Sequence, residues 1–328
     1  MPMKLYTLAY HTFVEVVRQP IYNVLLWAAA LWLALFNPAL AAYSLDIGSD
    51  IKIAKDVGMS TLMLVGLLMS VFAASGVISR EIETRSILTV ISKPVSRSVF
   101  ILGKYLGVGA AVLVAYYFLC VVMFVTFRQG IFEMAADKWD GPVLTFGLLA
   151  IGISLVAAAF ANYVYGWNFP ATLLAWVVPL SSFALLLTLC VSKEWAVQTP
   201  ATDWEKLNLG EMSKALLMVF CGVMLLNAFA IALATRLSQT MTLMACSAVF
   251  LIGLLSDYYF GRHVGSQMIY DLAYQIVPNF QFHWLGDALS QDLQISQRQV
   301  GLVAAYSGMY ALAVLALGVS LFQTREID

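Results

Sequence analysis

The chain has 328 residues, of which 61% are hydrophobic and 11% are charged, and its mean hydropathy is +0.84. Soluble globular domains carry about 25% charged and about 45–50% apolar residues, so this composition argues against a soluble domain and predicts a polytopic membrane protein. The formal net charge is −1, and no overall field points to a nucleic-acid partner.

Residues 1–20 predict a short amphipathic helix. Its apolar positions recur at helical spacing: Leu5, Leu8, Ala9, Phe13, Val16 and Val17. The polar residues Lys4, His11, Glu15 and Arg18 fall largely off that face. We expect the helix to lie on the membrane surface; a frayed polar leader is the alternative. We expect no cleavable signal peptide, because the first long apolar run lacks a small-residue cleavage site.

Eight apolar stretches within residues 21–328 are long enough to cross a membrane, which takes ~20 residues. They are 21–43, 58–79, 104–127, 142–164, 169–191, 214–235, 239–260 and 300–322. The predicted fold class is therefore an all-α bundle of about eight transmembrane helices. The stretches 142–164 and 169–191 are joined by a short link, and Pro170 and Pro179 fall in the second. They form either a tight spanning hairpin or a partly re-entrant element.

The connection 261–299 is the longest between two spans. Met268, Ile269, Leu272, Ala273 and Ile276 form a helical stripe that Pro278 ends. We interpret this connection as an outer amphipathic segment that dips into the outer leaflet, or as a folded outer loop without lipid contact.

Orientation follows from the charges in the connections. Eight spans place both termini on one side, together with the block 80–103. Lys and Arg divide evenly, nine to each side, so the short connections decide. Arg236 and this block lie in connections with few acids, whereas acids gather in the opposite loops. We therefore expect both termini in the cytoplasm.

One polar block, residues 80–98, interrupts the apolar sequence. A charge at the centre of a bilayer costs about 2.5–3.5 kcal/mol, so the block must lie at a membrane surface between two spans. Connections in bundles usually have about 2–8 residues, and this one is much longer and mixes charges with apolar residues. We interpret it as a surface that meets a soluble partner.

The same block predicts a short helix and a turn. Ser79 or Thr84 would start the helix, and acids early with Arg85 later suit the helix dipole. Pro94 ends it, and Ser96 or Ser98 would cap the next helix.

The run from Arg80 to Arg97, followed by Leu102-Gly103-Lys104-Tyr105-Leu106-Gly107, resembles the signature of ABC-2 type permeases. These are the membrane subunits of one class of ATP-binding-cassette exporters, and the nearest branch is the one around multicopper-enzyme maturation. The resemblance implies a six-span core, so 142–191 would be an extra hairpin. It also implies a permease homodimer or heterodimer in the bacterial cytoplasmic (inner) membrane, paired with cytoplasmic ATPase subunits that bind ATP and magnesium. Transport would be export.

In that family, the loop between the second and third spans is a coupling helix that docks on the ATPase. The resemblance therefore implies that acidic and basic residues of the block make polar contacts, that two apolar residues anchor it and that a Lys-Pro pair sets the turn. The predicted docking residues are Arg80, Glu81, Glu83, Arg85, Ile87, Leu88, Lys93, Pro94 and Arg97.

No catalytic motif or metal-binding motif is present in the sequence. The Gly103-Lys104 pair lacks the first glycine and the Ser or Thr of a P-loop. The histidines His11, His263 and His283 show no metal spacing, and we expect His263 and His283 at the surface. The four cysteines predict neither a disulfide framework nor a metal site. We expect a non-catalytic chain without a cofactor of its own.

Two other functions stay open at this stage. One is a membrane scaffold that recruits a soluble partner without transport. The other is a membrane-embedded enzyme, which is less favoured because the spans are nearly free of charge. The few polar residues in the spans favour helix-to-helix contacts over a substrate path, and the apolar bundle is compatible with a lipid-like cargo.

Overall fold

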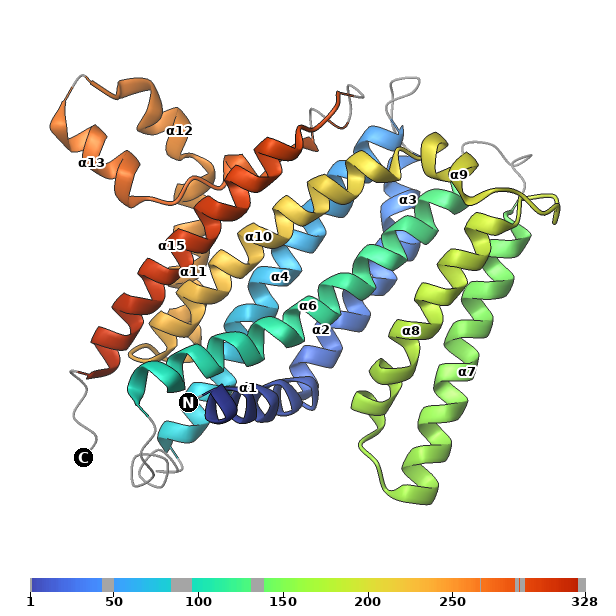
Figure 1. Ribbon diagram of the computed structural model, residues 1–328, viewed down its shortest axis with the longest axis horizontal. Coiled ribbons are helices and arrows are strands. Elements are labelled where there is room, and N and C mark those ends of the chain that lie inside the picture. The colour runs from blue at the N-terminus through green and yellow to red at the C-terminus, as the bar shows by residue number, and fades with distance from the viewer. Residues whose placement is uncertain are drawn as a thin grey trace.

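Helices that are long and apolar enough to cross a bilayer make up most of the molecule (Figure 1). The computed structural model describes residues 2–42, 50–83, 96–130, 139–265, 267–286, 289 and 293–323. Within these ranges the chain is helical, apart from turns, loops and one isolated antiparallel bridge between Val191 and Val197.

The described helices follow one another along the chain. They are α1 (Pro2–Val17), α2 (Pro20–Leu31), the π-helical η1 (Trp32–Phe36), α3 (Asn37–Ala41), α4 (Asp50–Glu83), α6 (Arg97–Gln129), α7 (Gly141–Tyr165), α8 (Phe169–Cys190), α9 (Pro200–Lys206), α10 (Leu209–Ala234), α11 (Gln239–Leu254), α12 (Ser256–Tyr259), η2 (Gly261–His263), α13 (Met268–Ile276), η3 (Gln281–His283) and α15 (Gln297–Gln323).

Seven helices in the described ranges are long and apolar enough to span a membrane, and one further pair of helices, bent where they meet, forms either a broken eighth span or a re-entrant loop. The predicted span 239–260 bends by 55° between α11 and the helical stretch Ser256–His263. The returning chain accounts for the break, because Phe280 N donates to Gly253 O at 3.1 Å and Gln281 Nε2 donates to Leu254 O at 2.8 Å. Carbonyls that end α11 are thus satisfied without continuing the helix.

The core consists of α4, α10 and α6, which the other helices surround. In their apolar windows, 67% of α4 and α10 is buried and 56% of α6, against 22% of α7. Two buried tyrosines join helices to α6: Tyr22 Oη of α2 donates to Ala111 O at 2.8 Å, and Tyr116 Oη of α6 donates to Leu216 O of α10 at 2.7 Å. A hydroxyl that leaves water needs such a partner.

Helices α7 and α8 form an antiparallel hairpin of two unbroken helices, as one of the two alternatives from the sequence required. Gly166, at φ +66°, ends α7 in the left-handed conformation that glycine tolerates. Asn168 caps α8 by accepting from Ala171 N at 3.1 Å. Pro170 falls in the first turn of α8, where its missing N–H has no partner to lose.

The first part of the connection between α11 and α15, which holds α12 and α13, forms an arm that projects from the bundle (Figure 1, orange). Its helix α13 confirms the predicted helical stripe. Met268, Ile269 and Ile276 on that stripe are 78%, 68% and 68% exposed, so no described part of the chain covers them.

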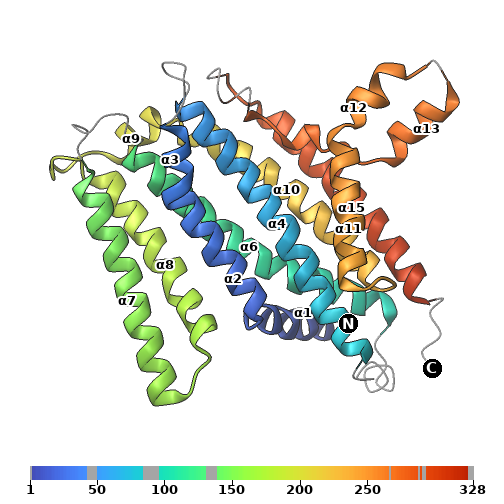
Figure 2. The same ribbon diagram turned by 180° about the vertical axis from the view of Figure 1, so that it is seen from behind.

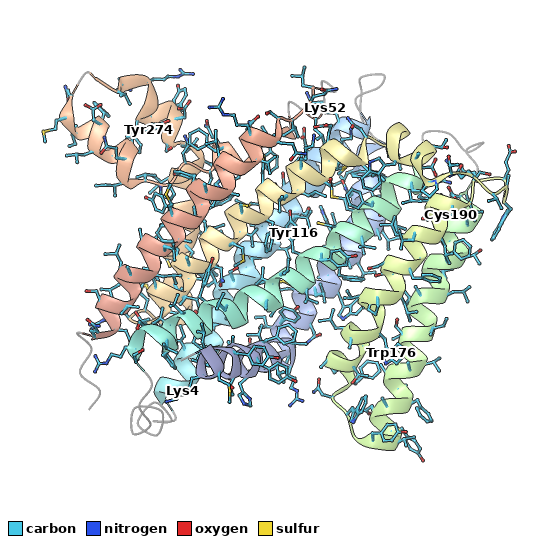
Figure 3. All side chains as sticks on the ribbon, in the orientation of Figure 1. Lys4, Lys52, Tyr116, Trp176, Cys190 and Tyr274 are labelled. Atoms are coloured by element: carbon cyan, nitrogen blue, oxygen red, sulfur yellow. The ribbon has the colours of Figure 1, made fainter. Side chains whose placement is uncertain are left out.

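The start of α1 and the end of α15 lie at the same end of the bundle, where α1 runs across the other helices (Figures 1 and 2). We call this end the α1 end and the opposite one the far end. Figure 3 shows Lys4 at the α1 end and Lys52 and Cys190 at the far end.

Candidate functional site

The predicted docking block leaves the bundle at the α1 end. Helix α4 continues without a break through Ser79 to Glu83, so the predicted start at Ser79 was wrong, and the alternative start at Thr84 lies outside the described residues. The apolar stretch Lys52–Ile78 of α4 is largely buried in the bundle, and the same helix continues beyond this stretch to Glu83. Among the predicted docking residues, Arg80, Glu81 and Glu83 lie in the last turns of α4. Five lie outside the described residues: Arg85, Ile87, Leu88, Lys93 and Pro94.

Helix α6 begins where the block ends. Ser96 is its N-cap, as predicted, and the Ser96 hydroxyl accepts from Val99 N at 3.4 Å. Arg97 turns back to the bundle, where its Nη1 donates to Gln323 O at 2.6 Å and to Phe322 O at 3.3 Å. A cation at the last carbonyls of a helix satisfies them and suits the helix dipole. The structure thus joins the start of α6 to the end of α15.

The Gly-Lys motif that follows has a packing role. A Cβ on Gly103 would lie 2.6 Å from Leu8 Cδ2, and one on Gly107 would lie 2.6 Å from Ala9 O. Small residues four apart let two helix backbones approach closely, and here they seat α1 on α6. Lys104, between them, is buried with its ammonium 5.5 Å from the Phe100 ring centroid.

The apolar face of α1 therefore faces the protein. Val16 and Val17 are 0% and 5% exposed, while Tyr6 and Tyr10 stack at 6.3 Å between ring centroids on the exposed side. A helix is present where the sequence predicted one, and its aromatic side is exposed; its position on a membrane surface stays a prediction.

A buried charge cluster lies at the far end, which the sequence reading missed. Arg128, at the end of α6, has its Nη1 2.6 Å from Asp140 Oδ2 and its Nη2 3.1 Å from Val191 O. Its Nε lies 2.7 Å from Asp203 Oδ2, a close ion-pair contact without hydrogen-bond geometry. Gln198 Nε2 also donates to Asp203.

This charge cluster joins four elements. Arg128 comes from α6, Asp140 precedes α7, Val191 follows α8 and Asp203 belongs to α9. The two carboxylate side chains are 0% and 8% exposed. The sequence reading had counted both acids among ordinary outer-loop charges. The cluster holds the far end of the α7–α8 hairpin against α6.

His283 is buried as well, which corrects its predicted surface position. It is 1% exposed, and its Nε2 lies 2.7 Å from Ser307 Oγ. A Cβ on Gly222 of α10 would lie 3.2 Å from the His283 ring, so η3 is wedged between α10 and α15. Burial lowers the pKa of His283 to about 4 from its ordinary 6.5, because the charged imidazolium loses its hydration.

Polar side chains inside the spans mostly join helices or bond to their own helix. Asn227 Nδ2 donates to Tyr105 O at 3.3 Å, and Tyr117 Oη lies 2.9 Å from Ser182 Oγ. All four cysteines are free thiols. In the described part of the chain, no group of three His, Cys, Asp or Glu side chains could hold a metal ion. In the described residues, these polar contacts connect helices to one another.

A family model described as ABC-2 family transporter protein matches residues 12–164. The matched stretch runs from within α1 to the end of α7. It contains the predicted docking block and the two glycines, Gly103 and Gly107, against which α1 packs. Comparison with curated proteins and with solved structures found no match.

Proposed function

The match over residues 12–164 supports an ABC-2 type permease, and from this premise we propose that the chain is the non-catalytic membrane subunit of an ATP-binding-cassette transporter. A separate cytoplasmic ATPase docks on the block 80–98, and its ATP-driven movement is transmitted to the helix bundle. The α1 end faces the cytoplasm, the permease works as a dimer, and the direction is export.

The observation that carries this proposal is the continuity of α4. One unbroken helix of 34 residues runs from Asp50, at the far end, to Glu83 in the docking block. Its apolar window is 67% buried, and it packs against α10, α6 and α2. A push on Glu83 is therefore applied to the core of the bundle without an intervening flexible joint.

The neighbours of the block extend the mechanical connection. Arg97 joins the start of α6 to the last carbonyls of α15. Gly103 and Gly107 hold α1 against the first turns of α6. A movement of the block therefore reaches α4, α6, α15 and α1 together, which is what coupling to an ATPase requires.

Charge reversal tests the docking. We expect Glu81→Lys with Glu83→Lys to abolish stoichiometric copurification of an ATPase from native membranes in mild detergent, while the permease still inserts and elutes as a single species. The control is Glu194→Lys, an exposed acid in the turn after α8 at the far end, which should leave copurification intact. If the double variant still brings down the ATPase at the wild-type ratio, the block is not the docking site.

A membrane scaffold is the competing function, since it would also hold a soluble partner. Reconstitution with the copurified ATPase separates the two. A transporter subunit should change the ATP turnover of its partner, and the Glu81→Lys, Glu83→Lys variant should lose this effect. Unchanged turnover with normal docking would favour the scaffold.

A further inference from the structure

A cavity of about 1090 Å³ opens between α1, α6 and the first half of α8. Apolar side chains form most of its wall, among them Phe13 and Val17 of α1, Val114 of α6 and Leu174 of α8. Trp176 also lines it, and Figure 3 shows this residue on the hairpin, toward the α1 end. Small-molecule sites usually measure about 300–1,000 Å³, so the space admits a large amphiphile.

The cavity lies at the end of the α7–α8 hairpin that is not held against α6. The charge cluster around Arg128 holds the far end, and the contact of Tyr117 with Ser182 joins α6 to α8 further along. Beyond that contact the α7–α8 hairpin diverges from α6 and α2 toward the α1 end, in both views (Figures 1 and 2). The cavity, which we call the wedge, therefore opens toward the membrane leaflet at the α1 end.

Arg18 provides the charge at this cavity. It is exposed, and it is the one charged residue among the described residues that line the space. Within the part of the chain that the structure describes, no hydrogen bond or ion pair engages its guanidinium. The Asn23 side chain donates to Val17 O at 2.9 Å and to Gln19 O at 3.0 Å. Those bonds fix the joint between α1 and α2, and so the position of Arg18.

The surroundings favour an anionic group here. A second cavity of about 860 Å³ on the other side of Arg18 includes Glu15 in its lining, whereas the wedge has no carboxylate in its lining. Trp167, Trp176 and Tyr10 stand around the wedge, and such amphipathic rings prefer the headgroup level of a membrane. Basic pockets between transmembrane helices bind anionic lipid head groups, because an opposite charge replaces lost hydration.

We propose that this wedge binds one anionic phospholipid from the leaflet at the α1 end. Its phosphate pairs with Arg18, and its acyl chains lie along α8 and α6 beside Trp176. The proposal needs only that the chain lies in a bilayer, so it stands or falls separately from the transport function.

Native mass spectrometry of the delipidated full-length protein tests the site. We would titrate it with phosphatidylglycerol and with phosphatidylcholine carrying the same acyl chains. Both lipids carry a phosphate, but in phosphatidylcholine the choline ammonium cancels its charge. The wild type should therefore bind the net-anionic lipid about tenfold more tightly. Arg18→Gln should reduce this preference to about onefold. Lys4→Gln removes a positive charge from the same helix outside the wedge, and it should leave the preference unchanged.

Two tryptophan substitutions test the site without changing Arg18. Ala175→Trp fills the wedge and should weaken both lipids, whereas Ala159→Trp, on an exposed face of α7, should not. Equal affinity of the wild type for both lipids, or an unchanged preference in Arg18→Gln, would overturn the proposal. Full competition by soluble glycerol phosphate would assign the charge site to a free anion instead. Disulfide cross-linking of two copies through Ala175→Cys would assign the wedge to a second copy.

Discussion

Replacing Arg128 with methionine should be among the most damaging single changes in this bundle. The change removes the cation that lies 2.6 Å from Asp140 and 2.7 Å from Asp203, and the bond to Val191 O. Methionine keeps much of the apolar stem, so the loss is mainly electrostatic. Two carboxylates, 0% and 8% exposed, would be left without their partner. Removing one partner of a buried ion pair costs about 3–5 kcal/mol, and we expect a loss of folding free energy of this size.

Heating in detergent followed by size exclusion would measure the effect as the temperature at which half the protein survives. Arg262→Met is the control, because its guanidinium lies over Tyr258, 4.4 Å from the ring centroid, at the surface. Such a contact is worth about 0.5–1 kcal/mol. The triple variant Arg128→Met, Asp140→Asn, Asp203→Asn should recover much of the loss, since no buried charge stays unpaired. If the triple variant is no more stable than Arg128→Met alone, the electrostatic reasoning is refuted.

Three further outcomes are expected. Gly107→Leu should lift α1 off α6 at a cost of about 1–3 kcal/mol and expose α1 to protease, whereas Gly152→Leu, which meets open space, should not. Arg97→Gln should speed hydrogen exchange in the last turn of α15 by about fivefold, since about 1 kcal/mol of capping is lost. His283 has a folded-state pKa of about 4, below the ordinary 6.5, so only the unfolded state gains a proton between these values. Stability should be full above about pH 6.5 and fall toward pH 4, and His283→Gln should flatten that profile.

Hydropathy predicted the spanning helices well, because the bilayer thickness sets their length. The predicted 142–164 and 169–191 match α7 (Gly141–Tyr165) and α8 (Phe169–Cys190). The predicted 58–79 is much shorter than α4, which runs from Asp50 to Glu83. Polar residues that continue a helix outside the hydrocarbon carry no hydropathy signal. The continuation of α4 to Glu83, which supports the coupling proposal, could therefore not be predicted from hydropathy.

The buried polar groups could not be found in the same way. Arg128 and Asp203 are far apart in the chain, and each looks like an ordinary charge beside a span. Asp140, directly before Gly141-Pro142, had a readable signal as a helix cap, and it does accept from Val143 N at 3.2 Å. His283 is buried only because the chain returns along α11 and bonds to Gly253. Such contacts depend on tertiary packing, which no local pattern encodes.

The charge cluster and the wedge are opposite ends of one hairpin, so a change at one should be felt at the other. Arg128 fastens the far end of α7–α8, and the wedge is bounded by the other end of α8. Loosening the fastening lets α8 tilt, which changes the distance between Trp176 and Arg18. We therefore expect Arg128→Met to weaken phosphatidylglycerol binding although Arg18 is untouched, and the triple neutral variant to restore it. The same titration by native mass spectrometry measures this, with Arg262→Met as control. Wild-type lipid affinity in Arg128→Met would mean that the wedge is held by the contacts of α8 with α6 alone.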